Sequence, residues 1–117
     1  MDIERLRAHC LTKKGAVEEY PFGPEYPVYK VAGKIFALIL LDTDPPWLNL
    51  KCDPLHAEVL RTYYPAIRPG YHMNKRHWNT VVLDGSVPVD ELLSMVDDSF
   101  ALVMAGLPKG LRRQLAP

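Results

Sequence analysis

Basic and polar side chains that could contact a nucleic acid gather in one part of this sequence, ahead of Asp84. Lysine and arginine bind phosphate oxygens, and aromatic rings stack on bases; asparagine hydrogen-bonds base edges, as Asn74 and Asn79 could do here. No Asp or Glu occurs between Glu58 and Asp84, so the window is locally basic. The pattern predicts a nucleic-acid-binding surface made by Arg68, His72, Asn74, Lys75, Arg76 and His77.

The same residue types also have a purely structural interpretation. Tryptophan is highly buried on average, which favours a core position for Trp78. Asn74 and His77 would then satisfy backbone groups of an irregular loop, and Lys75 and Arg76 would be ordinary solvated charges. In a third interpretation, the residues from Tyr71 to Ser86, here called the polar stretch, line a pocket against Trp47 or Tyr29 and bind a small ligand or a protein partner.

Nucleophilic catalysis finds little support in the spacing of these residues. Ser86 follows Asp84-Gly85 and lacks the flanking glycines of a nucleophile elbow, so it is interpreted as a turn residue. Cys52 lies beside Lys51 and ahead of a predicted helix, a position that lowers a thiol pKa only if the side chain is exposed. We expect both Cys10 and Cys52 to be buried and reduced, and the protein not to be an enzyme.

A metal site would have to draw on dispersed residues. None of the pairs among them has the spacing of a zinc finger or a metalloprotease. We therefore expect no metal and no other cofactor. The residues considered are His9, Cys52, His56, His72 and His77.

Length and charge limit the class of protein. A chain of 117 residues that is 48% hydrophobic forms one domain, spanning 1–117. Its 14 basic and 14 acidic residues cancel, so any nucleic-acid contact must rest on a local patch. No signal peptide and no apolar run of about 18 residues is present. We expect a cytoplasmic monomer that does not enter a membrane.

Local signals place the elements that must position these side chains. Asp2 is a cap for a first helix with Ile3, Leu6, Cys10 and Leu11 inward and Gly15 after its end. Asp53-Pro54 starts a second helix that ends at Pro65, with Leu55, Val59, Leu60 and Tyr63 inward. Apolar residues from Val89 to Leu107 predict a long third helix, followed by a short basic segment.

Strands are predicted at 16–20, 27–31, 34–41, 47–51 and 78–83, and the apolar run from Ile35 to Leu41 marks the most buried of them. Short turns between neighbouring strands favour antiparallel pairing. The predicted fold is an α+β two-layer sandwich, an antiparallel sheet with its helices on one face.

These motifs together resemble the MmcQ/YjbR family of small bacterial proteins, over nearly the whole chain. Lys14 stands where a proline is usual, which affects only a helix end. The resemblance rests on Lys14-Gly15-Ala16, on 48–54, 68–75 and 77–81, and on the Leu-Asp-Gly turn within 83–88.

The resemblance implies a frataxin-like CyaY fold and a DNA-binding role through a "double wing" of hairpins. Frataxins also suggest iron, but they use an acidic ridge on and after the first helix. Here that helix offers only Asp2 and Glu4, and it ends in Lys13-Lys14. We therefore expect a non-enzymatic, DNA-binding module, with a small-ligand or protein-interaction adaptor as the alternative.

Overall fold

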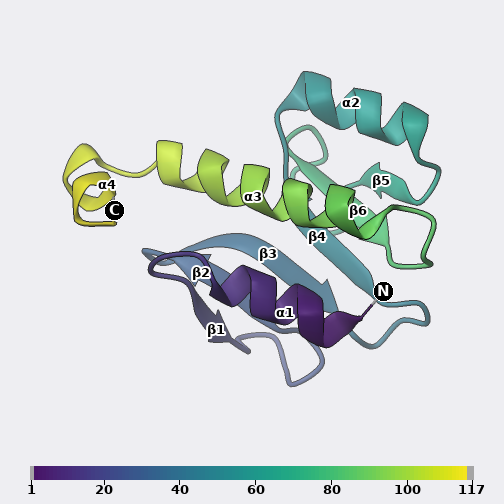
Figure 1. The fold of residues 1–117 in the computed structure, drawn as a ribbon, viewed down its shortest axis with the longest axis horizontal. Coiled ribbons are helices and arrows are strands. Elements are labelled where there is room, and N and C mark those ends of the chain that lie inside the picture. The colour runs from purple at the N-terminus through teal and green to yellow at the C-terminus, as the bar shows by residue number, and fades with distance from the viewer. Residues whose placement is uncertain (1, 116–117) are drawn as a thin grey trace.

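The computed structural model describes residues 2–115, which form a single sheet and four helices (Figure 1). The helices are α1 (Ile3–Leu11), α2 (Pro54–Tyr63), α3 (Val89–Ala105) and α4 (Lys109–Leu115). The strands are β1 (Val17–Glu19), β2 (Val28–Val31), β3 (Lys34–Leu40), β4 (Trp47–Lys51), β5 (Ile67–Pro69) and β6 (Trp78–Val82).

The six strands form one antiparallel sheet in the order β1-β2-β3-β4-β6-β5. Helix α3 lies across β3 and β4, α1 lies beside α3, and α2 packs on β5 and β6 (Figure 1). The main core fills the space between these helices and the sheet. The predicted α+β sandwich with helices on one face is confirmed.

The first two helices begin where their caps predict. The carboxylate of Asp2 accepts hydrogen bonds from the backbone N–H groups of Glu4 and Arg5, at 2.9 and 3.4 Å. Asp53 accepts from the N–H of His56 at 3.3 Å, and Pro54 occupies the first turn. The end of α1 differs from the expectation, because Thr12 caps it three residues before Gly15.

A bulge in β3 puts two successive residues, Phe36 and Ala37, in the core on the helix side of the sheet. Tyr29 pairs with Ala37 but Lys30 pairs with Ile35, so Phe36 is an extra residue in the ladder. Its side chain turns toward the helices and packs edge-on against Phe100, with ring centroids 5.2 Å apart. Buried Ser99 donates to the carbonyl of Phe36 at 2.6 Å, which fixes α3 to the bulge.

The inward stripe predicted for α2 is wrong for three of its four residues. Leu55, Val59 and Tyr63 are 75%, 62% and 74% exposed, while Leu60 is buried together with Ala57. Apolar residues occupy two sides of this helix, and the side that meets β5 and β6 is the one bearing the small Ala57. Leu11, expected inward on α1, is also exposed at 46%.

Two elements were not expected from the sequence. Strand β5 has only three residues, and its register is set by pairing with β6, Ile67 opposite Val81 and Pro69 opposite Asn79. The closing basic segment is helix α4. Within residues 2–115, no helix has the length and hydropathy needed to cross a membrane.

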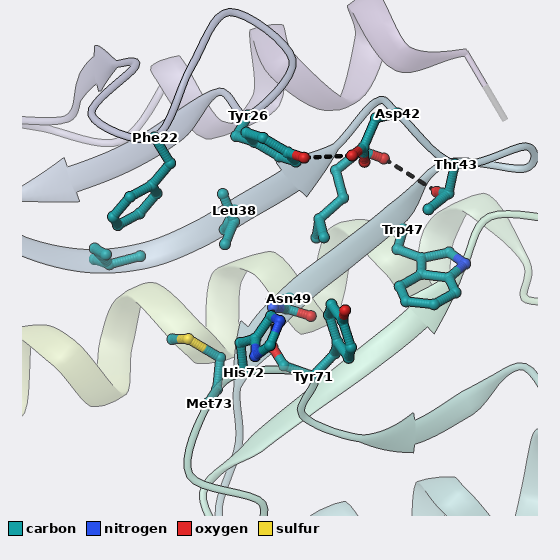
Figure 2. A pocket seen from close by; sticks show the side chains of 12 residues that line it. Phe22, Tyr26, Leu38, Asp42, Thr43, Trp47, Asn49, Tyr71, His72 and Met73 are labelled. Atoms are coloured by element: carbon teal, nitrogen blue, oxygen red, sulfur yellow. Dashed lines mark hydrogen bonds between the residues drawn. The ribbon is translucent and has the colours of Figure 1, made fainter.

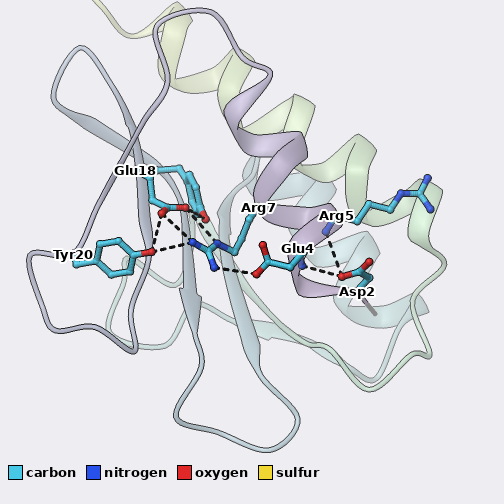
Figure 3. Close-up of polar contacts among 7 residues, drawn as sticks. Asp2, Glu4, Arg5, Arg7, Glu18 and Tyr20 are labelled. Atoms are coloured by element: carbon cyan, nitrogen blue, oxygen red, sulfur yellow. Dashed lines mark hydrogen bonds and ion pairs between the residues drawn. The ribbon is translucent and has the colours of Figure 1, made fainter.

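Polar contacts join α1 to the hairpin of β1 and β2 (Figure 3). Arg7 donates to both carboxylate oxygens of Glu18, at 3.3 and 3.0 Å, and to the hydroxyl of Tyr20 at 3.0 Å. Glu18 also accepts from the hydroxyls of Tyr20 and buried Tyr29, at 2.7 and 2.6 Å. This network holds the end of β1, from which the next loop reaches over the sheet.

The face of the sheet away from the helices, here called the outer face, carries a second apolar cluster. Val28, Leu38 and Leu40 are buried there, with Tyr26, Ile35 and Trp47 packed partly over them. In the register of the sheet, Leu38 lies opposite Asn49, which lies opposite Thr80. Among residues 2–115 no helix residue packs on this cluster, and the loops that follow β1, β3 and β5 surround it.

Candidate functional site

The outer face holds a pocket of about 470 Å³ (Figure 2). Its floor is the apolar cluster of β3 and β4, and its walls are the loops that follow β1, β3 and β5. The lining residues are Phe22, Tyr26, Ile35, Leu38, Leu40, Asp42, Thr43, Trp47, Asn49, Tyr71, His72 and Met73.

Two buried polar residues of the sheet hold the wall that carries Tyr71. Asn49 donates its side-chain N–H to the Tyr71 carbonyl at 3.0 Å, and the N–H of Tyr71 donates to Thr80 Oγ1 at 2.7 Å. Thr80 in turn donates to Asn49 Oδ1 at 2.5 Å. Because Asn49 and Thr80 are 0% and 3% exposed, this closed set of bonds fixes the backbone of the loop.

Aromatic rings pack along the same wall. Trp47 and Tyr71 meet edge-to-face with ring centroids 5.3 Å apart, and the His72 ring lies 4.0 Å from that of Tyr71. His72 has a φ of 57°, an uncommon conformation for a residue other than glycine. The turn thereby places the Tyr71, His72 and Met73 side chains along the pocket (Figure 2).

The opposite wall joins the loops that follow β1 and β3. The hydroxyl of Tyr26 donates a hydrogen bond to the carboxylate of Asp42, and Figure 2 shows this pair at the pocket edge. The bond to Asp42, followed by loss of surrounding water, raises the pKa of the Tyr26 hydroxyl. The backbone N–H of Leu41 donates to the Glu25 carbonyl at 2.9 Å, which ties the two loops together.

Three of the six predicted nucleic-acid contacts take part in hydrogen bonds of the loop before β6, Asn74 and Lys75 through their side chains and His77 through its backbone. Asn74 Oδ1 accepts from the backbone N–H groups of Arg76 and His77, at 2.9 and 3.3 Å. Lys75 Nζ donates to the Gly70 carbonyl at 3.1 Å. The His77 carbonyl accepts from the N–H of Cys52 at 2.8 Å.

The other three predicted residues have different surroundings. His72 lines the pocket, Arg76 is exposed in the loop, and Arg68 is exposed on β5. Arg68 lies close enough to Asp84 to contribute, after the hydrogen bonds from Ser86, to the lowered pKa of that carboxylate. The window that is free of acids in sequence therefore has an acid beside it in space.

Other residues of the stretch pack against the helices or beside β5. Asn79 is fully buried and its Oδ1 accepts from Arg61 Nε at 2.7 Å, so it cannot contact a base. Trp78 is half-buried, and a side chain on Gly70 would place Cβ 2.7 Å from its Cβ. The pocket interpretation involves Trp47 rather than Tyr29, which lies buried in the core under the helices.

Comparison with known proteins identifies the family. The YjbR family model matches residues 11–102. The chain belongs to the YjbR family. It is 35% identical to uncharacterized protein YjbR of Escherichia coli K12, over 98% of each chain. It is 41% identical to uncharacterized protein YbdF of Escherichia coli O157:H7, covering 84% of this chain and 80% of YbdF.

Solved structures of related proteins share the fold of this YjbR-family chain. A crystal structure of Deinococcus radiodurans protein DR2400, with domain DUF419, superposes with a TM-score of 0.90 at 39% identity. The match covers 97% of this chain and 86% of that one. A Pseudomonas syringae protein superposes with a TM-score of 0.76 at 30% identity, covering 87% and 98% of the two chains.

The two cysteines of this family member lie away from the pocket. Both are buried and unpaired, as predicted. Burial, the main cause in each case, raises the pKa of Cys10 to about 12 and that of Cys52 to about 11, so neither is a thiolate at neutral pH. Among residues 2–115, no three His, Cys, Asp or Glu side chains are grouped so as to hold a metal ion.

Most of the pocket lining was not predicted from the sequence. Of its lining, only His72 was among the six predicted site residues, and Trp47 was named as a neighbour. Phe22, Tyr26 and Asp42 come from loops interpreted as breaks between strands. The apolar run of β3 did indicate a covered outer face. A strand that is apolar on both faces needs other parts of the protein or a ligand over each face.

Proposed function

We propose that this YjbR-family chain is a non-enzymatic binding module that holds a small organic molecule in the outer-face pocket. The observation that carries the proposal is the combination of size and lining. Ligand pockets typically enclose about 300–1,000 Å³ and are mainly apolar and aromatic, with a few polar groups that orient the ligand. A volume of about 470 Å³, lined with aromatic rings, an amide, a carboxylate and an imidazole, fits that description.

Preorganisation supports the same proposal. The bonds among Asn49, Thr80 and Tyr71 hold one wall, and the Tyr26–Asp42 bond holds the other. A site whose walls are already fixed spends little binding free energy on ordering its own side chains. Polar networks of this kind fix a backbone that an apolar floor alone would leave free to shift.

Binding without catalysis is proposed because the described lining has neither a serine nor a cysteine, and its one threonine is not paired with a base. Cys10 and Cys52 are buried elsewhere and protonated at neutral pH. The hydroxyl of Thr43 donates to the Leu40 carbonyl at 3.3 Å rather than to a base. The Asp42 carboxylate accepts from Tyr26.

Saturation-transfer NMR with indole, a neutral aromatic probe, tests the proposal. Phe22 lines the pocket rim and is 62% exposed, so Phe22→Ala removes a wall without opening the core. We expect this variant to weaken indole binding about threefold to tenfold, the range of one aromatic contact. Leu55→Ala, which truncates an exposed side chain on α2, is the matched control and leaves binding unchanged. Equal indole affinity in the wild type and Phe22→Ala would contradict the proposal.

The exposed arginines support a second proposal, that the β5–β6 hairpin contacts nucleic-acid phosphates. Arg68 and Arg76 are exposed, and no ion pair of either side chain occurs within the described residues. The hairpin and its loop contain no carboxylate between β5 and the end of β6. Lys75, in contrast, is held by the Gly70 carbonyl.

Fluorescence anisotropy of a labelled DNA duplex, at low and at physiological salt, tests this second proposal. We expect Arg68→Ala/Arg76→Ala to weaken binding and to lower the slope of log affinity against log salt by about 2, one unit for each lost phosphate contact. Arg112→Ala/Arg113→Ala removes the same charge from exposed positions of α4 and serves as the control. If DNA binding does not weaken with salt, or if both variants weaken it equally, the hairpin is not the binding site.

A further inference from the structure

The described pocket lining carries a carboxylate that no lysine or arginine of the lining balances. Asp42 carries the one carboxylate among the described lining residues, and none of them is a lysine or an arginine. A ligand with a negative group would therefore bring that group near a carboxylate with no cation in the lining to offset it. Asp42 is exposed at the pocket edge, so solvent weakens this repulsion without removing it.

The Asp42 carboxylate is not compensated from outside the pocket either. It accepts from the Tyr26 hydroxyl, a neutral donor, and forms no ion pair within residues 2–115. Lys30, on the neighbouring strand β2, is paired with Glu19 at 3.0 Å. The carboxylate is thus available to a ligand group that carries a positive charge.

The aromatic side chains of the lining favour the same kind of ligand. Four of the lining side chains, Phe22, Tyr26, Trp47 and Tyr71, carry aromatic rings, and they come from three separate parts of the chain (Figure 2). The faces of these rings carry negative electrostatic potential and attract cations, tryptophan most strongly. Rings together with one carboxylate form the arrangement by which proteins hold ammonium groups.

We infer that the ligand of this pocket is an organic cation, an ammonium group carried on an apolar body. This inference rests on the proposed binding function and names its ligand class. The ammonium group lies against Asp42 and the aromatic rings, and the apolar body lies on the floor made by Leu38 and Leu40. A neutral ligand of the same shape gains the floor contacts but leaves the carboxylate without a counter-ion.

Three probes of similar size and different charge test the inference. Benzyltrimethylammonium, benzyl alcohol and phenylacetate are titrated into the ¹⁵N-labelled protein, and binding is followed at the indole N–H signal of Trp47, assigned with Trp47→Phe. Trp78 is the internal control because it lies outside the pocket lining. We expect the cation to bind at least tenfold more tightly than the alcohol, and phenylacetate to bind most weakly.

Asp42→Asn separates charge from shape. Asparagine retains an acceptor for the Tyr26 hydroxyl, so the wall stays in place while the charge is lost. We expect the variant to bind benzyltrimethylammonium about threefold to fivefold more weakly, the range of an exposed charge pair, and benzyl alcohol within twofold of the wild type. Asp44→Asn, which neutralises an exposed residue two positions away and outside the lining, leaves both affinities unchanged.

The outcomes distinguish this inference from the proposed function. If benzyl alcohol or phenylacetate binds as tightly as the cation, or if Asp42→Asn leaves the cation affinity unchanged, the cation assignment is wrong and the pocket remains a binding site. If no probe of any charge shifts the Trp47 signal, the pocket proposal fails with it.

Discussion

At the scale of single residues, buried hydroxyls connect the sheet to its surroundings. Ser99 is fully buried, donates to the Phe36 carbonyl and accepts from the N–H of Lys51 at 2.9 Å. It therefore satisfies the carbonyl that the bulge leaves outside the ladder and one N–H of β4. Thr80 has the matching role on the outer face, toward Tyr71.

Replacing Ser99 by alanine should be costly, because it leaves the half-buried N–H of Lys51 and the buried carbonyl of Phe36 without their partner. We expect Ser99→Ala to lower the free energy of unfolding by about 2 to 4 kcal/mol. Urea denaturation measures this, with Ser94→Ala at an exposed position of the same helix as control, expected within about 0.5 kcal/mol of the wild type. If Ser99→Ala lowers the free energy of unfolding no more than Ser94→Ala does, water replaces these hydrogen bonds and the role assigned to Ser99 is wrong.

Residue types alone could not separate binding groups from structural ones in the polar stretch. Asn74 and Lys75 have the chemistry to contact a base and a phosphate, yet both satisfy backbone groups of their own loop. The structural interpretation of Asn74 was therefore available from the sequence, since asparagine commonly bonds the backbone two residues on. The bond of Lys75 depends on where the chain returns to Gly70, which no local pattern predicts.

At the scale of elements, the contact between α1 and the first hairpin depends on pH. Partial burial acts to raise the pKa of Glu18, but the hydrogen bonds from Tyr29, Arg7 and Tyr20 outweigh it, and the pKa lies below its ordinary value of 4.5. A depressed carboxylate pKa stabilises the fold fully above the unfolded value. That stabilisation is lost as the pH falls through the folded value.

Glu18→Gln should therefore remove part of the pH dependence of stability. We expect the variant to be less stable than the wild type near neutral pH by about 1 to 2 kcal/mol, and the difference to shrink as the pH falls from about 5 to about 3. Urea denaturation at a series of pH values measures the difference. Asp84 and Asp97 also have lowered pKa values, but they are present in both proteins, so their contributions to the pH dependence cancel in the difference.

Glu58→Gln, at an exposed position of α2, is the control and should leave the pH profile of the wild type unchanged. A difference between wild type and Glu18→Gln that stays constant across this pH range would contradict the role assigned to the Glu18 charge.

Elements with strong local signals were predictable, and those set by distant partners were not. The caps Asp2 and Asp53 lie within one turn of the helices they start, so the sequence alone locates them. Strand β5 exists because β6 is beside it, and its three residues include a proline. Which face of α2 is buried depends on how closely the helix approaches β5 and β6. Because two sides of the helix are apolar, the periodicity of its sequence does not show which of them faces the sheet.

At the scale of the whole molecule, the site is a consequence of topology. The sheet order brings the loops after β1, β3 and β5 around one apolar patch, although their residues span positions 22 to 73. The fold class and the family followed from the sequence. The pocket did not, because it is made by contacts between loops that are separate in the chain.

An amide chemical-shift map of the ¹⁵N-labelled protein on addition of indole tests the central claim most directly. We predict that the shifts concentrate in the loops around the outer-face pocket and on the strands of its floor, at residues 22–26, 38–43, 47–49 and 71–73. A competing apolar surface exists in the exposed stripe of Leu55, Val59 and Tyr63 on α2. Shifts confined to that stripe, or no shifts up to the solubility limit of indole, would contradict the account.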